Sequence, residues 1–269
     1  MNTQRLSTLK AVENEYLTYF AEAEEHEFFT KFTDNKLPSM YSHNCIVLKE
    51  TVNGADLHTQ IERLFAEAQK SAAQHLYLVL HPNHAFAIHA WEAEVFDQSS
   101  LLYMTVSLDD YQGTKSNPDC KVYEATSPAQ YQDAVLFDIA ASVAEEEKHA
   151  NYRFSYKRAY RKLPVFERHA PALSQYVAYL DDVPVGKCEI SRHQAIIRIE
   201  NFSVIVECQR KGVGTAILNT IAEDGKARGA NEFFLVADVA DTAKHMYKKL
   251  GFQTVGVEHQ LLWFSLTKS

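Results

Sequence analysis

The stretch Ile197–Thr215, IRIENFSVIVECQRKGVGT, reads as a strand that runs through a glycine-containing loop into a helix. Its first half is rich in β-branched and aromatic residues in near alternation, which is the pattern of a strand. The loop contains Gly212 and Gly214, and neither has a β-carbon to keep a ligand away from the main chain. This order of strand, loop and helix decides which fold we expect.

The loop is suited to binding an anion such as a pyrophosphate. The first N–H groups of the following helix lack intrahelical acceptors, and the helix dipole adds partial positive charge there. Arg210 and Lys211 place two cations beside the same main chain. The alternative is an ordinary strand-to-helix turn with two surface cations, and a GxG sequence alone does not exclude it.

The segments around the loop predict an α/β domain with a mixed sheet. Apolar residues after Val213 fall on one helical face, and Gly229 ends that helix. The predicted order is strand 121–126, helices 128–147 and 152–168, strands 175–181, 185–192 and 197–206, helix 213–229, strand 231–238, helix 241–250, and strands 253–259 and 261–266.

Charge is distributed unevenly along the 269 residues. Residues 1–117 hold 8 Lys and Arg against 16 Asp and Glu, whereas residues 118–269 hold 19 of each sign, so the first half carries the whole net charge of −8. This balance offers no basic surface for nucleic acid, and we expect no nucleic-acid partner. Hydrophobic residues make up 46% of the chain, enough to form a sizeable core.

The sequence predicts a cytoplasmic protein without a membrane partner. No apolar run reaches the roughly 18 residues of a membrane span, and the first residues lack the apolar stretch of a signal peptide. The cysteines are scattered without metal-ligand spacing, which favours reduced thiols. They are Cys45, Cys120, Cys188 and Cys208.

Two motifs, in this order, resemble those of the GCN5-related N-acetyltransferase (GNAT) superfamily. The first is Gln209-x-x-Gly212-x-Gly214, between a strand and a helix. The second is Tyr-x-x-Leu-Gly-Phe, found at residues 247–252. Residues from about 120 to 269 are therefore similar to that superfamily, whose members transfer an acyl group from acetyl-CoA to an amine.

The sequence departs from the superfamily pattern at one position. An asparagine often stands seven residues before the tyrosine, and Ala240 occupies that position here. Its contact with the pantetheine arm must be absent or replaced, with Asp241 or Thr242 as substitutes.

The resemblance implies an acyl-CoA N-acyltransferase fold with acetyl-CoA as cosubstrate and no metal. It also implies that the main chain of residues 202–204 pairs with the pantetheine arm, and that the N–H of Val204 stabilises the oxyanion. The residues expected to contact the cofactor are Phe202, Ser203, Val204, Gln209, Arg210, Lys211, Gly212, Val213, Gly214 and Thr215.

Tyr247 and Glu200 are the candidate catalytic residues. A phenol near the thioester sulfur can protonate the leaving thiolate, although an aromatic residue at the spacing of Tyr247 is also typical of a core position. Glu200 shares even-number parity with Phe202 and Val204, so we expect it on their face of the strand as general base. The alternative is a solvated or paired carboxylate, and Glu207 is a weaker candidate.

The amine acceptor is not identified by the sequence. In this fold the segment between the first two helices, here residues 145–153, usually selects it, and Glu145, Glu146 and Glu147 could attract a cationic amine. A solvated helix end is the alternative for this run of charges. A small amine, an amino sugar, a polyamine, a peptide N-terminus and a lysine all remain open, as does the oligomeric state.

The first half repeats the element order of the second. The predicted elements of this half are a helix at 57–68, a strand at 75–81, a helix at 84–96 and a strand at 101–108. They precede the corresponding elements of the second half by a nearly constant number of residues. We therefore expect tandem domains, a degenerate copy at 1–117 and a catalytic domain at 118–269, although α/β segments of similar length also arise by chance. Four histidines of this half lie on different elements with no carboxylate or cysteine at matched spacing, so no metal is expected; they are His43, His81, His84 and His89.

The sequence thus predicts an N-acetyltransferase that moves an acetyl group from acetyl-CoA to a small-molecule or peptide amine. A non-catalytic acyl-CoA-binding or regulatory module is the main alternative. A structural interaction protein without a ligand is a third.

Overall fold

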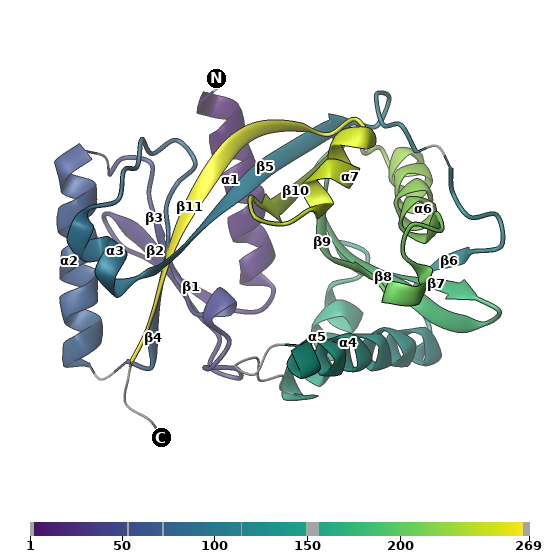
Figure 1. Ribbon diagram of the computed structural model, residues 1–269, viewed down its shortest axis with the longest axis horizontal. Helices are drawn as coiled ribbons and strands as arrows, with labels where there is room; N and C mark the ends of the chain where they lie inside the picture. The colour runs from purple at the N-terminus through teal and green to yellow at the C-terminus, as the bar shows by residue number, and fades with distance from the viewer. Residues whose placement is uncertain (1–2, 53, 72, 114, 149–155, 266–269) are drawn as a thin grey trace. The chain divides into compact units, whose positions relative to one another are not determined.

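The computed structural model describes residues 3–52, 54–71, 73–113, 115–148 and 156–265, and it describes no side chains between 141 and 157. The chain divides into two compact units (Figure 1). The first comprises residues up to Met104 with Val236–Lys244 and the segment from Thr254; the second comprises Thr105–Leu235 with His245–Gln253. None of the described helices is both long and apolar enough to cross a membrane.

The second unit is a mixed sheet with helices on both faces. Its strands follow the order β10-β9-β8-β7-β6, in which β9 and β10 are parallel and the other neighbours are antiparallel. The strands are β6 (Lys121–Glu124), β7 (Leu173–Leu180), β8 (Val183–His193), β9 (Ile196–Val204) and β10 (Glu232–Asp238). The helices are α4 (Pro128–Lys148), α5 (Tyr156–His169), α6 (Val213–Ala227) and α7 (Ala243–Lys249).

The two faces of this sheet have different chemistry. Toward α6 point Tyr176, which donates a hydrogen bond to Asp224 of that helix (3.0 Å), and Ile197, which packs against Gly225. Toward α4 and α5 point polar residues, including Glu189, whose carboxylate accepts from Lys162 of α5 (2.9 Å). Figure 1 shows α6 on one side of β7 and β8, and α4 with α5 on the other.

In the first unit, the neighbouring strands pair in the order β1-β2-β3-β4-β11, with parallel and antiparallel pairs. Helix α2 connects β3 to β4, which are parallel, and its residues Leu57, Ile61 and Leu64 pack against Leu78 in the core. The elements are α1 (Thr3–Thr18), β1 (Glu22–Glu25), β2 (Phe29–Thr33), η1 (Tyr41–His43), β3 (Ile46–Leu48), α2 (Gly54–Lys70), β4 (His75–Val79), α3 (Ala90–Val95), β5 (Asp97–Ser107) and β11 (Gln253–Phe264).

The same succession of elements occurs in both halves of the chain. The first half runs β3-α2-β4-α3 and the second runs β9-α6-β10-α7, each with a parallel strand pair joined through a helix. This agrees with the tandem arrangement predicted from the sequence. Helix α1 and strands β1 to β3 were not predicted from the sequence.

The end of the chain differs from the prediction. The two strands expected at 253–259 and 261–266 are one strand, β11, because its pairing with β4 continues from Gln260↔Val79 to Phe264↔His75 without a turn. The residues from Thr254 therefore belong to the first unit. Conversely, the segment after β5 belongs to the second unit, where the N–H of Leu108 donates to the carbonyl oxygen of Asn231 (2.8 Å). The compact units thus do not follow a single division at residue 117.

The helix predicted at 84–96 is also shorter than expected. It begins only at Ala90, because the carboxylate of Glu92 accepts a hydrogen bond from the N–H of His89 (2.7 Å) and so fixes the first turn.

The end of α7 explains the Leu-Gly-Phe motif. The N–H of Phe252 donates to the carbonyl oxygen of Tyr247 (3.0 Å), an arrangement that requires a left-handed residue between the helix and Phe252. Gly251 supplies it with φ = 97°, and a β-carbon there would lie 2.9 Å from the carbonyl oxygen of Asp110. Phe252 is buried and stacks on Phe233. The motif therefore fixes the last turn of the helix that carries Tyr247.

We predict that Gly251→Ala destabilises the protein more than Gly229→Ala. Both glycines follow a helix with positive φ (97° and 85°), so each substitution incurs the left-handed penalty of roughly 1–2 kcal/mol. Only Gly251 is also crowded by main chain, whereas a β-carbon at Gly229 meets nothing within 4 Å. Urea unfolding of the two variants measures the difference. Equal losses of stability would show that the close approach to Asp110 is relieved without cost.

Candidate active site

Strand β9 has an open edge next to the glycine-containing loop. Its parallel pairing with β10 ends at Ile199↔Leu235 among the described residues, while β9 itself continues to Val204. Antiparallel pairing with β8 continues on the opposite edge to Gly186↔Val204. The main chain after Ile199 is therefore held in strand geometry on one side and can accept an extended ligand on the other.

A β-bulge at Asn201 changes which residues face which side of β9. Asn201 has φ = 45°, and the β8–β9 register shifts at the same place. Before the bulge, Glu200 lies opposite Glu189 on the face that carries α4 and α5. After it, the ring of Phe202 lies against Gly214 of α6, so Phe202 is on the opposite face.

The expectation that Glu200 shares a face with Phe202 and Val204 is therefore wrong. The inserted left-handed residue breaks the period of two on which the parity argument depends. The carboxylate of Glu200 is about one third exposed and is paired with the buried guanidinium of Arg198 (2.8 Å). Glu200 still lies in the segment that follows the last β9–β10 pair, on the side of α4 and α5.

The bulge is held by a buried cluster of charged and polar side chains. The side-chain amide of Asn201 donates to Glu189 (2.9 Å) and to Asp138 of α4 (3.3 Å). Lys187, which is fully buried, donates to the same two carboxylates, and Lys162 of α5 donates to Glu189. Two cations and two carboxylates thus meet around one amide group.

Each charge in this cluster is stabilised by its neighbours. Burial alone would raise the pKa of Glu189, but Lys162 and Lys187 outweigh burial and hold that pKa well below its usual range. Burial alone would lower the pKa of Lys187, but Glu189 and Asp138 raise it. Both groups remain charged at neutral pH, and the cluster ties β8, β9, α4 and α5 together around the bulge.

The loop before α6 has the backbone geometry of an anion site. Arg210 and Gly212 both have positive φ, 60° and 80°, and such changes of backbone hand form the concavities in which N–H groups converge. Gly212 also packs against main chain, since a β-carbon there would lie 2.6 Å from the carbonyl oxygen of Lys115. Arg210 and Lys211 are exposed, and no pairing between them and a carboxylate is seen in the described part of the chain.

The other predicted cofactor residues fall into two groups. Gln209 is exposed, and its amide nitrogen donates to the carbonyl oxygen of Val204 (3.1 Å), so it connects the loop to the end of β9. Val213 is buried and faces the core rather than a ligand. Ser203, Gly214 and Thr215 are half-buried.

Tyr247 lies beside the strand and the loop. Its ring centroid is 6.5 Å from that of Phe202, and Phe202 in turn packs on Gly214. Only 8% of Tyr247 is exposed. The structure thus brings together the end of β9, the first turn of α6 and Tyr247, as the two sequence motifs predicted, while Glu200 lies on the other face of β9.

The structure describes the surroundings of Asp241 but not those of the predicted acceptor segment. The carboxylate of Asp241 accepts a hydrogen bond from the N–H of Ala243 (3.0 Å), the first residue of α7, and so satisfies one donor at the start of that helix. This engagement leaves Asp241 poorly placed to replace the absent asparagine. The predicted acceptor segment, residues 145–153, lies outside the residues whose side chains the structure describes.

The cluster around Asn201 was not predicted from the sequence, although the alternation of apolar residues indicates the bulge. Apolar residues occupy odd positions at Ile197 and Ile199 and even positions at Phe202 and Val204. This change of phase is what a one-residue bulge produces in an alternating strand. Nothing in the local pattern indicates that Lys187 and Glu189 converge on it from a neighbouring strand.

Comparison with known proteins agrees with this geometry. Residues 138–252 match the family described as Acetyltransferase (GNAT) family. Over 264 residues, the chain is 25% identical to the uncharacterized N-acetyltransferase CgeE of Bacillus subtilis (strain 168), covering 95% of this chain and 97% of the other.

Two solved structures share the fold over nearly the whole chain. A functionally unknown conserved protein from Staphylococcus epidermidis has a TM-score of 0.71 at 20% identity, covering 91% of this chain and 95% of the other. A GCN5-related N-acetyltransferase from Kribbella flavida has a TM-score of 0.65 at 12% identity, covering 96% and 95%. The stretch 138–252 thus matches the GNAT family, and the predicted acyltransferase fold is confirmed.

We predict that Asn201→Ala lowers the free energy of unfolding by about 1 kcal/mol more than Asn201→Gly. Both changes remove the hydrogen bonds to Asp138 and Glu189, but only alanine must also adopt a left-handed backbone, which costs roughly 1–2 kcal/mol. Chemical denaturation measures both. If alanine were tolerated as well as glycine, the bulge would not require its left-handed conformation.

Proposed function

We propose that the second unit catalyses acetyl transfer from acetyl-CoA to an amine. The observation that carries this proposal is the open edge of β9 after Ile199, which leads directly to the glycine-containing loop and to Tyr247. A pantetheine arm is an extended chain with amide groups, and it can pair with a strand edge as another strand would. The loop lies where the pyrophosphate of the same molecule would be held.

The main chain of the loop provides N–H donors for the pyrophosphate. The first-turn N–H groups of α6 and the left-handed residues Arg210 and Gly212 supply donors, and the exposed cations Arg210 and Lys211 add charge. Gly214 allows Phe202 to lie against the helix and so keeps the strand next to the loop.

The reaction needs one proton donor and one proton acceptor. As the amine nitrogen attacks the thioester carbonyl, the N–H of Val204 stabilises the negative oxygen. The carbon–sulfur bond then breaks, and the phenol of Tyr247 gives its proton to the thiolate. Glu200 takes the proton that the amine nitrogen must lose.

The pairing of Glu200 with Arg198 is consistent with a role as base. The ion pair holds the carboxylate in one orientation, while its exposed fraction leaves it accessible from the side of α4 and α5. An amine that enters from the side of α4 and α5 would reach the exposed part of this carboxylate. The acceptor is a small-molecule or peptide amine, and a panel of amines assayed for CoA release would identify its class.

A non-catalytic acyl-CoA-binding module is the second candidate. It is favoured by Ala240 in place of the usual asparagine. Such a protein would bind acetyl-CoA without releasing CoA in the presence of any amine.

We expect Tyr247→Phe to lower kcat by at least about 100-fold, because the thiolate loses its proton donor, and to leave the Kd for acetyl-CoA within about 2-fold. Steady-state kinetics and calorimetric titration measure the two quantities. Phe252→Leu is the control, since Phe252 packs beside Tyr247 without a hydroxyl group. A variant with full turnover would exclude Tyr247 as general acid, and wild type that binds acetyl-CoA but never turns over would favour the binding module.

We expect Glu200→Gln to lower kcat/KM by about 10- to 100-fold near neutral pH, with a smaller deficit at higher pH, where the amine is already unprotonated. Glu207→Gln is the matched control, because Glu207 is an exposed carboxylate beyond the end of the same strand. A rate deficit that does not change with pH would assign Glu200 a structural role through Arg198.

A further inference from the structure

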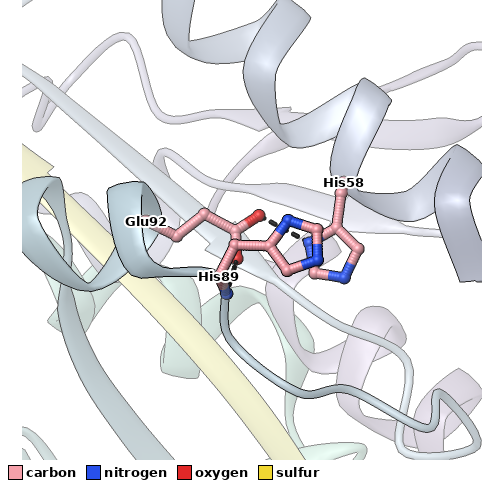
Figure 2. A group of neighbouring side chains, drawn as sticks. All are labelled: His58, His89 and Glu92. Carbon is pink, nitrogen blue, oxygen red and sulfur yellow. Dashed lines mark hydrogen bonds and ion pairs between the residues drawn. The ribbon is translucent and has the colours of Figure 1, made fainter.

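Three side chains of the first unit converge on one point. His58 comes from α2, His89 directly precedes α3, and Glu92 belongs to the first turn of α3. Figure 2 shows the two imidazole rings and the carboxylate pointing toward one another. One ligand atom from each residue lies within 4.8 Å of the other two.

The donor set is that of a transition-metal site. Two imidazoles and one carboxylate are typical of sites in which zinc has three protein ligands and an open position. The three donors come from two helices, so they are held by the fold rather than by one flexible loop. The sequence pattern does not reveal the cluster, because His58 and His89 are distant in the chain.

The carboxylate of Glu92 has no exposed surface. Its Oε1 is 2.7 Å from Nδ1 of His58, and its Oε2 accepts from the N–H of His89 (2.7 Å). A buried negative charge requires a cation or several donors. Without a metal, the proton between Nδ1 of His58 and Oε1 of Glu92 must provide the contact that stabilises this charge.

The second imidazole distinguishes a metal site from a simple ion pair. The rings of His58 and His89 stack with centroids 3.5 Å apart and an interplanar angle of 10°. An ion pair with Glu92 needs only one of them, and two protonated rings at this distance would repel each other. A metal ion bound by neutral imidazoles uses both rings once the exposed His89 ring rotates out of the stack, because imidazole lone pairs lie in the ring plane, and the ion replaces the bridging proton.

Access and support are both present. His89 is exposed, so an ion can reach the cluster from solvent, whereas His58 is largely covered and stacks on Phe86.

Helices α2 and α3 hold the positions in the first half that α6 and α7 hold in the second. The cluster thus joins the two helices whose counterparts carry the glycine-containing loop and Tyr247.

We propose that His58, His89 and Glu92 bind a divalent transition-metal ion of the zinc type and that this ion fastens α2 to α3. Metal binding at Nδ1 of His58 replaces the hydrogen bond from that nitrogen to Glu92, and the neutral ring then carries its proton on Nε2. The proposal concerns the first unit and does not depend on acetyl transfer by the second.

The test is titration of the full chain with zinc chloride after removal of metals by a chelator. We expect about one equivalent of zinc to bind and to raise Tm, because an ion that binds only the folded state stabilises it. His58→Ala and His89→Ala should each weaken binding by at least about 10-fold. Cobalt bound in place of zinc should give a visible absorption spectrum, which His89→Ala abolishes.

The control is His26→Ala. His26 is partly exposed and lies 3.3 Å from Glu24, so it reproduces a single histidine–carboxylate pair without a second imidazole. This variant should bind zinc as wild type does. His89→Ala removes the ring that stacks on His58, so the metal-free Tm of this variant is measured as well; lost zinc binding in a chain that is still folded at the titration temperature reflects the missing ligand. Zinc binding that is absent in wild type, or unchanged in His89→Ala, would overturn the proposal.

Discussion

The geometry of the candidate active site depends on one side-chain amide among buried charges. Asn201 donates to Glu189 and Asp138, and Lys187 and Lys162 neutralise those carboxylates. If one charge were removed, its partner would remain buried without compensation, which commonly costs about 3–5 kcal/mol. The cluster therefore has few alternative arrangements. It fixes the bulge, and the bulge turns Phe202 toward the loop while Glu200 stays on the face of α4 and α5.

The sequence predicted most of the second unit because the signals there are local. The glycine-containing loop, the helix after it and the Tyr-x-x-Leu-Gly-Phe motif each depend on a left-handed or β-carbon-free residue at a fixed place. The structure shows the first-turn crowding at Gly214 and the positive φ of Gly212 and Gly251 that these motifs require. Tyr247 lies beside Phe202, and its catalytic role remains a prediction.

What the sequence could not predict involves residues that are distant along the chain. The face of Glu200 was misassigned because a period of two holds only in a strand without a bulge, and the groups that hold the bulge come from β8, α4 and α5. The cluster of His58, His89 and Glu92 likewise forms only when α2 and α3 are in place. The single strand β11 was divided in two because its pairing partner, β4, lies in the opposite half of the sequence.

The pairing of β11 with β4 has a consequence for the order in which the chain can fold during synthesis. The first unit contains residues up to Met104, yet its sheet lacks a strand until residues after Thr254 have been made. An early N-terminal intermediate would expose the hydrogen-bonding edge of β4 while the rest of the chain is translated, and unpaired edges promote aggregation. Completion of the first unit is therefore a late event, and for the same reason a cut between the two halves of the sequence would not yield two independent proteins.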